Sequence, residues 1–304
     1  MSNILTIEVK EAIDKKIRDY LKYEHNLSSR LIKKSALDKK IKVNGEVVKL
    51  NYRVKERDII EIDLKRDESQ NIIPEKMDID VIYEDDHIIV VNKPPFMVVH
   101  PTKSHQTGTL SNGILNHFQE NNEKCIVRLV SRLDMDTSGL IIIAKNQHAH
   151  MALAKEMEHN KIDKIYLAIV HGILKEKTGT ICAPIGRESL EGIKRIVNNG
   201  GKEAITHYEV VEEFNNKASL VKLKLETGRT HQIRVHLSYI GHPIMGDSLY
   251  GMPDELKYIN RQALHAYKLK FRHPKSKEEI VLESTLAEDM KNLIEYIKNE
   301  DAQV

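Results

Sequence analysis

Apolar residues follow two patterns along the chain, one with the period of a helix and one with the alternation or continuity of a strand. The helical pattern places apolar side chains on one face of several long segments: residues 11–23, 109–118, 146–159 and 286–298. Strand-like runs stand at residues 58–62, 81–91, 141–144, 164–170 and 221–225. Because both patterns occur throughout, the sequence predicts an α+β protein.

The first sixty residues predict a small unit of helices followed by a hairpin. Residues 11–23 have helical spacing, and a second short helix follows them. Asn44 and Gly45 both accept a positive φ, which favours a tight hairpin turn. A polar stretch with Pro74 and no apolar period comes next and predicts a linker. The expected divisions are a small domain over residues 1–66, a linker over 67–77 and a larger domain over 78–304.

The net charge of +2 over 304 residues does not by itself indicate a nucleic-acid-binding protein, so the position of the charges matters. One stretch of the first domain holds many cations and a single acidic residue, Asp38. The cations, which we expect to contact nucleic-acid phosphates, are Arg30, Lys33, Lys34, Lys39, Lys40 and Lys42. The alternative is that they only solvate a helix face, as charge runs normally do.

A polar loop directly precedes residues 141–144, whose continuous apolar character is typical of a strand covered on both faces. The loop contains Asp134, and the hydroxyl and glycine residues at 137–139 favour a tight turn. An acidic side chain on such a loop is well placed for catalysis. Arg132, two residues earlier, could keep the carboxylate ionised by charge pairing. A capped surface turn is the alternative, and the residues alone leave both open.

Other features exclude several classes of protein. Cys125 and Cys182 lie far apart without C-x-x-C spacing, so we expect neither a disulfide framework nor a zinc site, and a reducing compartment fits. His231 and His236 are five residues apart and fall on different helix faces, which also argues against zinc. The chain shows neither a signal peptide nor an apolar run of bilayer length. We therefore expect a cytoplasmic protein without metal, cofactor or membrane partner.

Three segments of the larger domain resemble the RluA-type pseudouridine synthases. The segment RLDMDTSGL (residues 132–140) is similar to that family's signature, in which the aspartate is catalytic. KPPFMVVHP (residues 93–101) and TGRTHQIRVH (residues 227–236) resemble its first and third motifs. The chain differs from the family at Ser131, where histidine is commoner, and at Phe96, where glycine is usual. Three motifs in the family's order are far more specific than any one of them.

The first domain resembles the small RNA-binding domain named after ribosomal protein S-four, which also combines a basic helix pair with a hairpin. The similarity covers roughly residues 13–64, and Arg57 stands where that domain usually has glycine. A second basic segment, residues 187–201, lies in the larger domain. It includes Lys194 and Arg195, which we expect to contact RNA as well.

The resemblance implies a catalytic domain with a mixed, mainly antiparallel sheet flanked by helices. It implies an isomerase that converts uridine to pseudouridine in structured RNA, with large-subunit (23S) ribosomal RNA or its precursor as the favoured substrate and no cofactor or metal. We expect a monomer. The residues that it implies for the site are Asp134 as the catalytic carboxylate, Arg229 as its charge partner, Tyr166 as the stacking residue and Arg132 beside the aspartate. Whether Asp134 acts as a nucleophile or as a base toward the sugar stays open.

Two other functions compete with this interpretation. An aspartate-dependent phosphohydrolase would also use an Asp-x-Asp segment, but it needs the threonine one place later, a purely apolar strand before the first aspartate, and magnesium. A non-catalytic RNA-binding protein could keep the fold, although Asp134, Tyr166 and Arg229 would then have no reason to be intact together. Activity in excess chelator would separate the isomerase from the phosphohydrolase.

Overall fold

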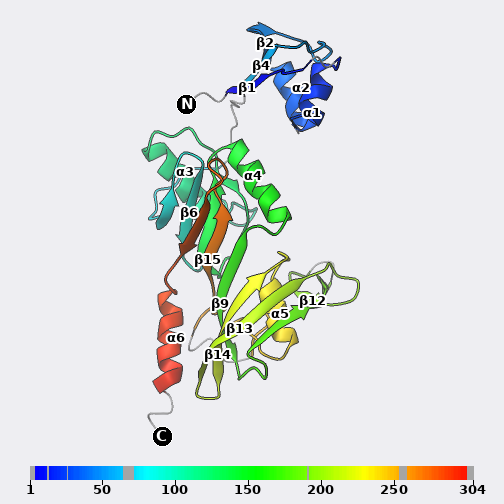
Figure 1. Ribbon diagram of the computed structural model, residues 1–304. Helices are drawn as coiled ribbons and strands as arrows, with labels where there is room; N and C mark the ends of the chain where they lie inside the picture. The colour runs from blue at the N-terminus through cyan, green and yellow to red at the C-terminus, as the bar shows by residue number, and fades with distance from the viewer. Residues whose placement is uncertain are drawn as a thin grey trace. The chain divides into compact units, whose positions relative to one another are not determined.

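A computed structural model of the chain describes residues 4–11, 14–25, 27–63, 72–189, 192–252 and 259–299. The chain divides into two compact units, Met1–Ser69 and Gln70–Val304 (Figure 1). Residues 64–71, which include the first part of the expected linker, lie outside the described residues. Each unit has its own hydrophobic core.

The first unit is an antiparallel sheet of order β1-β4-β2-β3 with two helices. Its elements are β1 (Ile4–Glu8), α1 (Ile17–Tyr23), α2 (Ser29–Leu37), β2 (Ile41–Val43), β3 (Glu46–Val47) and β4 (Ile59–Asp63). The β2–β3 turn has Asn44 at φ 52° and Gly45 at φ 85°, the conformation that this pair favours. Arg57 adopts φ 68°, so the turn before β4 keeps a glycine-type backbone without glycine.

Two features of the first unit differ from the expectation. Strand β1, which we did not expect, pairs along its whole length with β4. Helix α1 begins at Ile17 rather than at residue 11, because Lys16 is extended and forms a β-bridge with Arg53. Helix α2 begins at Ser29, since the Ser28 hydroxyl accepts the Leu31 N–H at 3.2 Å and caps the helix.

The second unit is built on a large sheet of order β10-β13-β14-β9-β15-β8-β6-β5, with β7 beside β8 and β16 beside β15 (Figure 1). Its strands are β5 (Val81–Glu84), β6 (Ile88–Lys93), β7 (Arg128–Leu129), β8 (Ser138–Ala144), β9 (Asp163–His171), β10 (Thr178–Cys182), β13 (Ile205–Phe214), β14 (Ala218–Leu225), β15 (Leu264–Arg272) and β16 (Glu279–Glu283). A small hairpin, β11 (Ile185–Arg187) and β12 (Arg195–Val197), stands outside this sheet. Among the described strands, β8 and β15 pair in parallel and the other pairs are antiparallel. The expected mixed, mainly antiparallel sheet is confirmed.

Strand β8 is buried at every position, as its continuous apolar run predicted. Alternate residues of β6 and β8 point to opposite faces of the sheet. Helix α3 (Leu110–Glu120) packs through Ile114 and Phe118 on the face that carries Ile141. Helix α4 (Gln147–Glu158) packs through Leu153 on the face that carries Ile142. Both helices match the helical segments expected from the sequence.

Helices α5 (Gln232–Tyr239) and α6 (Glu288–Asn299) pack against the other half of the sheet. Ile233 and Leu237 of α5 and Leu293 of α6 join a core with β9 and β14. The helix expected at residues 286–298 is thus displaced by only a residue or two. Within the described ranges, no helix is both long and apolar enough to cross a bilayer.

Candidate active site

Asp134 lies on the loop that enters β8, where the two halves of the large sheet meet. The Thr137 N–H donates to the Asp134 carbonyl at 3.1 Å and closes the turn. Gly139 has φ 109°, and a Cβ at this position would collide with the backbone of Ala266 on β15. Glycine is therefore required for β8 and β15 to pair at this point. The loop stands on a rigid junction in the middle of the sheet.

The charge partner of Asp134 is Arg234, not Arg229 as we expected. Arg234 Nη1 donates to Asp134 Oδ2 at 3.2 Å, and Arg234 is 7% exposed. The Asp134 side chain is 34% exposed, so it is less buried than the sequence suggested. One side of the carboxylate thus contacts a buried cation, while the other side stays open to solvent.

Arg229 points elsewhere because it precedes α5 instead of belonging to it. Its N–H donates to the side-chain oxygen of Gln232, the first residue of the helix, at 2.9 Å. Its Nε donates to the Glu203 carbonyl at 2.8 Å, and the side chain is exposed. Arg234, two residues into α5, faces the Asp134 loop. The helix start therefore selects which arginine of the motif reaches the aspartate.

A second carboxylate holds Arg234 in place. Asp247 is buried, and its two oxygens accept Nε and Nη2 of Arg234 at 2.7 and 2.8 Å. Asp247 also accepts the N–H groups of Leu249 and Tyr250 at 3.0 Å. Burial by itself would lower the pKa of Arg234, but the bonds to Asp247 and the charge of Asp134 outweigh it and raise that pKa. The guanidinium is therefore a fixed cation.

His231 lies beside the same carboxylate. Its Nε2 is 3.9 Å from Asp134 Oδ2, and its Nδ1 is 2.9 Å from the Tyr250 hydroxyl, which accepts the Arg195 N–H at 2.8 Å. Burial lowers the pKa of His231, and the charges of Arg234 and Arg195 lower it further. The charges of Asp134 and Asp247 raise it, but the net shift is downward. The ring is thus kept neutral and can hydrogen-bond without adding charge.

Tyr166 comes from β9 and lies on the same side of the sheet as α5. It stands opposite Leu223 on β14 and Ala266 on β15. Burial raises the pKa of Tyr166, and the charge of Asp134 raises it further. The Tyr166 phenol therefore lies within electrostatic reach of the Asp134 carboxylate. The phenol stays protonated and can donate a hydrogen bond but cannot readily accept a proton.

Two buried basic residues, Lys93 and Arg261, hold the Asp134 loop, although we did not predict either of them as a site residue. Lys93 is fully buried, and its Nζ donates to the carbonyls of Pro94, Met97 and Met135 at 2.8, 2.9 and 2.8 Å. The Lys93 ammonium therefore joins the segment after β6 to the residue that follows Asp134. The signal was present in the sequence, since Lys93 opens one of the three matched motifs.

Arg261 holds the far end of the loop. Its Nη1 donates to the Asp136 carbonyl at 3.0 Å and its Nη2 to the Ser138 hydroxyl at 3.2 Å. Asp289, at the start of α6, accepts Nε and Nη2 at 2.6 and 2.7 Å. Because Arg261 is 2% exposed, these contacts couple α6 to the Asp134 loop through the protein interior.

Among the described residues, Arg132, Lys194 and Arg195 make neither a hydrogen bond nor an ion pair with Asp134. Arg132 is exposed on the loop, and no hydrogen bond or ion pair of its side chain is seen in the part of the chain that the structure describes. Lys194 lies 3.8 Å from Glu188 in the β11–β12 hairpin, and Arg195 follows it. In the first unit, the expected cations are exposed except for Lys40, which is partly buried: Arg30, Lys33, Lys34, Lys39, Lys40 and Lys42.

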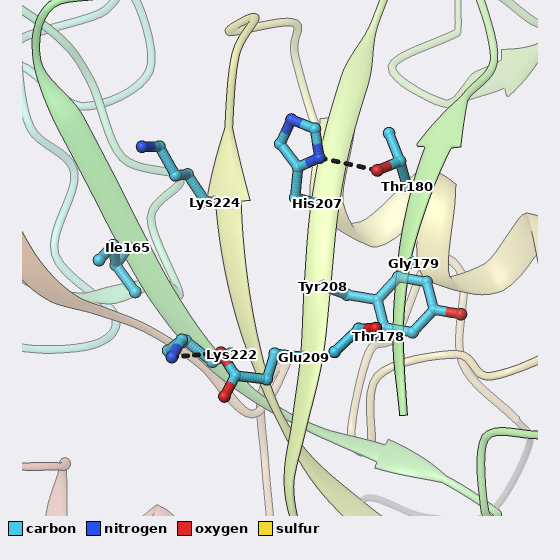
Figure 2. A pocket seen from close by; sticks show the side chains of 9 residues that line it. All are labelled: Ile165, Thr178, Gly179, Thr180, His207, Tyr208, Glu209, Lys222 and Lys224. Carbon is cyan, nitrogen blue, oxygen red and sulfur yellow. Dashed lines mark hydrogen bonds and ion pairs between the residues drawn. The ribbon is translucent and has the colours of Figure 1, made fainter. Parts of the chain in front are cut away.

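A pocket on the large sheet is separate from this site. Figure 2 shows its lining residues: Ile165, Thr178, Gly179, Thr180, His207, Tyr208, Glu209, Lys222 and Lys224. Successive residues of a strand point to opposite faces, so Ile165 faces away from the side that carries Tyr166. The lysines are paired with carboxylates, as Lys224 is with Asp163 at 2.8 Å. The pocket therefore presents no free cation to an anionic ligand.

Comparisons with known proteins agree with the geometry. Residues 87–239 match the family described as RNA pseudouridylate synthase. The RNA pseudouridine synthase YhcT of Bacillus subtilis (strain 168) is 48% identical over 254 residues, which cover 83% of this chain and 83% of that protein. The ribosomal large subunit pseudouridine synthase D of Vibrio parahaemolyticus is 36% identical over 288 residues, which cover 90% of this chain and 88% of the other.

A solved structure shows the same likeness. The structure of Human RNA Pseudouridylate Synthase Domain Containing 1 superposes with a TM-score of 0.58 at 29% identity, covering 68% of this chain and 83% of that one. These matches confirm the RluA-type resemblance and give no support to a phosphohydrolase or to a non-catalytic protein. The region that contains Asp134, Tyr166 and Arg234 lies within the matched segment, and the chain belongs to the RNA pseudouridylate synthase family, as an isomerase that makes pseudouridine in RNA.

Proposed function

We propose that the enzyme isomerises uridines of large-subunit ribosomal RNA and that Asp134 is its reacting carboxylate. The observation that carries the catalytic assignment is the 3.2 Å contact between Asp134 and the buried Arg234, with the carboxylate still 34% exposed. The ribose of the substrate uridine would approach the solvent-exposed side of the Asp134 carboxylate, whose charge is held in place by Arg234. The relatives named as large-subunit synthases support the RNA class.

The reaction needs no group donor. The bond between N1 of the uracil and C1′ of the ribose breaks, the base turns, and C5 bonds to C1′. C5 loses a proton and N1 gains one, so atoms and charge balance within the substrate. Asp134 either attacks the sugar or removes a proton from it, and both roles require the uridine to leave its helical stack.

Tyr166 and Arg132 would complete the site. A protonated phenol beside Asp134 can stack on the flipped uracil and donate a hydrogen bond to it. Arg132 extends from the same loop into solvent, where its guanidinium can occupy the space that the flipped base leaves or hold a phosphate. Arg234, rather than Arg229, balances the charge of the carboxylate.

We assign RNA binding outside the site to two basic surfaces. The first unit, residues 1–66 of the expected division, would act as an S-four-type domain ahead of the linker at 67–77 and the catalytic domain at 78–304. Its exposed cations on and after α2 support this role. Lys194 and Arg195 of the β11–β12 hairpin would contact RNA near the site, since the Arg195 N–H bonds to Tyr250. A ribosomal substrate is consistent with a cytoplasmic location. We also propose that the protein is a monomer.

The test compares RNA from cells with and without the protein. Sequencing that detects pseudouridine should show one or more sites of large-subunit ribosomal RNA that disappear with the protein. Purified enzyme should restore those sites, and Asp134→Asn should not. Sites that disappear from transfer RNA alone would overturn the proposed substrate while leaving the reaction intact.

A further inference from the structure

Phe96 combines two features that folding alone does not explain. It adopts φ 62°, a left-handed conformation that is unfavourable for a bulky side chain, and the residue is 56% exposed. Glycine would adopt this backbone without strain. A strained position normally persists because the surrounding structure or a function requires it, and an exposed ring adds little to the core.

The turn that carries Phe96 is rigid. Pro94 and Pro95 fix their own φ angles directly before it. The buried Nζ of Lys93 binds the carbonyl of Pro94 on one side of Phe96 and that of Met97 on the other, at 2.8 and 2.9 Å. The ring therefore projects into solvent from a backbone that is held at both ends, and binding a partner would order little more of it.

The same ammonium places this turn beside the reacting carboxylate. Lys93 Nζ also binds the carbonyl of Met135, which follows Asp134 in the loop, at 2.8 Å. The carbonyl oxygens of Met97 and Met135 therefore both bind the Lys93 nitrogen and lie within two hydrogen-bond lengths of each other. The Met135 side chain is itself 42% exposed. The two loops that carry the exposed residues Phe96 and Met135 are therefore joined through their backbones next to Asp134.

We propose that Phe96, on the turn that Lys93 joins to the Asp134 loop, is a stacking platform for a nucleobase of the RNA that neighbours the target uridine. When the uridine leaves its stack, the neighbouring base loses a stacking partner, and an aromatic ring on a rigid turn can replace it. Stacking is tolerant of base identity, so the platform would add affinity and hold the RNA in register rather than read its sequence. The inference depends on the RNA substrate class but not on which RNA carries the uridine.

The test compares Phe96→Gly, Phe96→Tyr and Phe96→Leu in the full-length protein. The substrate is total RNA from cells that lack the protein, which contains every uridine the enzyme acts on. Single-turnover rates at increasing enzyme concentration give the half-saturating concentration and the maximal rate. Phe96→Gly should raise the half-saturating concentration about ten-fold, Phe96→Leu by less, and Phe96→Tyr by under about two-fold. The melting temperature of Phe96→Gly should equal or exceed that of the wild type, because the backbone is relieved.

Asn216→Gly is the matched control, since Asn216 has φ 54° in the β13–β14 turn and takes no part in the site. It should leave both kinetic constants unchanged. Equal half-saturating concentrations for wild type and Phe96→Gly, or equal losses in the Gly and Tyr variants, would overturn the stacking role. Mapping the modified sites in the same samples tests the proposed substrate separately, because the ratio between variants does not depend on which RNA they modify.

Discussion

Asp134 and Asp247 bind opposite ends of one guanidinium, that of Arg234. Asp247 takes two nitrogens at 2.7 and 2.8 Å, and Asp134 takes the third at 3.2 Å. Asp247 is 3% exposed, whereas the Asp134 side chain is 34% exposed. The buried aspartate therefore orients the arginine, and the arginine in turn positions the exposed aspartate. The site is preorganised before RNA arrives.

Asp134→Asn should abolish isomerisation while RNA affinity stays within about two-fold, because the change removes the reacting charge at nearly constant volume. Single-turnover assays and filter binding on the same RNA would measure both. Appreciable turnover by the purified variant would mean that another group reacts. Asp136→Asn is the control for a nearby carboxylate on the same loop, and it should keep substantial activity.

Arg234→Met should lose activity and destabilise the protein by about 3–5 kcal/mol, since it leaves Asp247 buried without its cation. Arg229→Met should cost under about 1 kcal/mol, because that side chain is exposed and bonds to a single backbone carbonyl. Urea denaturation of both variants gives the comparison. If Arg229→Met proved the more damaging of the two, the pairing seen in the structure would be wrong.

Tyr166→Phe tests the hydroxyl apart from the ring. Stacking should persist, so RNA binding should change little. If the phenol donates a proton or a hydrogen bond during the reaction, the maximal single-turnover rate should fall by about 10²-fold or more. A rate near that of the wild type would restrict Tyr166 to stacking, and Tyr166→Leu should then show the larger loss.

The stability of the second unit should fall between pH 7 and pH 5 because of His265. Burial, reinforced by Arg261, lowers the pKa of His265 to about 4, while both ring nitrogens lie 2.9 Å from the hydroxyls of Ser138 and Ser284. The unfolded chain binds a proton near pH 6.5 and the folded chain does not, so stability is lost as the pH falls through this range. We expect the loss from this residue to be about 2 kcal/mol at pH 5.

The measurement is urea denaturation of wild type and His265→Gln at pH 7 and pH 5. The variant should be less stable at pH 7 but should lose less on acidification, since it has no imidazole to protonate. Parallel losses in the two proteins would show that carboxylates alone cause the acid sensitivity.

The basic surface of the first unit is tested by salt dependence. Changing Arg30, Lys33 and Lys34 to Gln should weaken RNA binding and reduce the slope of log affinity against log salt by about 0.7–0.9 for each phosphate contact removed. The control variant changes Lys22, Lys49 and Lys55 to Gln together. It alters the net charge by the same amount but leaves Arg30, Lys33 and Lys34 in place. Equal slopes of log affinity against log salt for the two triple variants would mean that the cations on α2 are solvated and do not contact phosphates. The maximal rate at saturating RNA should not change, because Asp134 belongs to the second unit.

Local chemistry determined much of this molecule. The continuous apolar run at residues 141–144 predicted a strand buried on both faces, and β8 is one. Asn44 and Gly45 predicted a turn with positive φ, and the hydroxyl and glycine residues at 137–139 predicted the tight loop that presents Asp134. Side-chain caps at Ser28 and Thr109 begin α2 and α3. These outcomes depend on neighbours within a few residues, so the sequence alone contains the required interactions.

Tertiary structure decided which side chains meet. Arg229 and Arg234 belong to one motif, and only the start of α5 and the burial of Asp247 select Arg234 as the partner of Asp134. Lys93 and Arg261 bind carbonyls 42 and 125 residues away in the sequence, and such contacts have no local pattern. We did not predict strand β1, because its partner β4 lies at the other end of the first unit in the sequence. The elements follow from short-range propensity and periodicity, whereas a catalytic site is a set of long-range distances that exist only once those elements have packed.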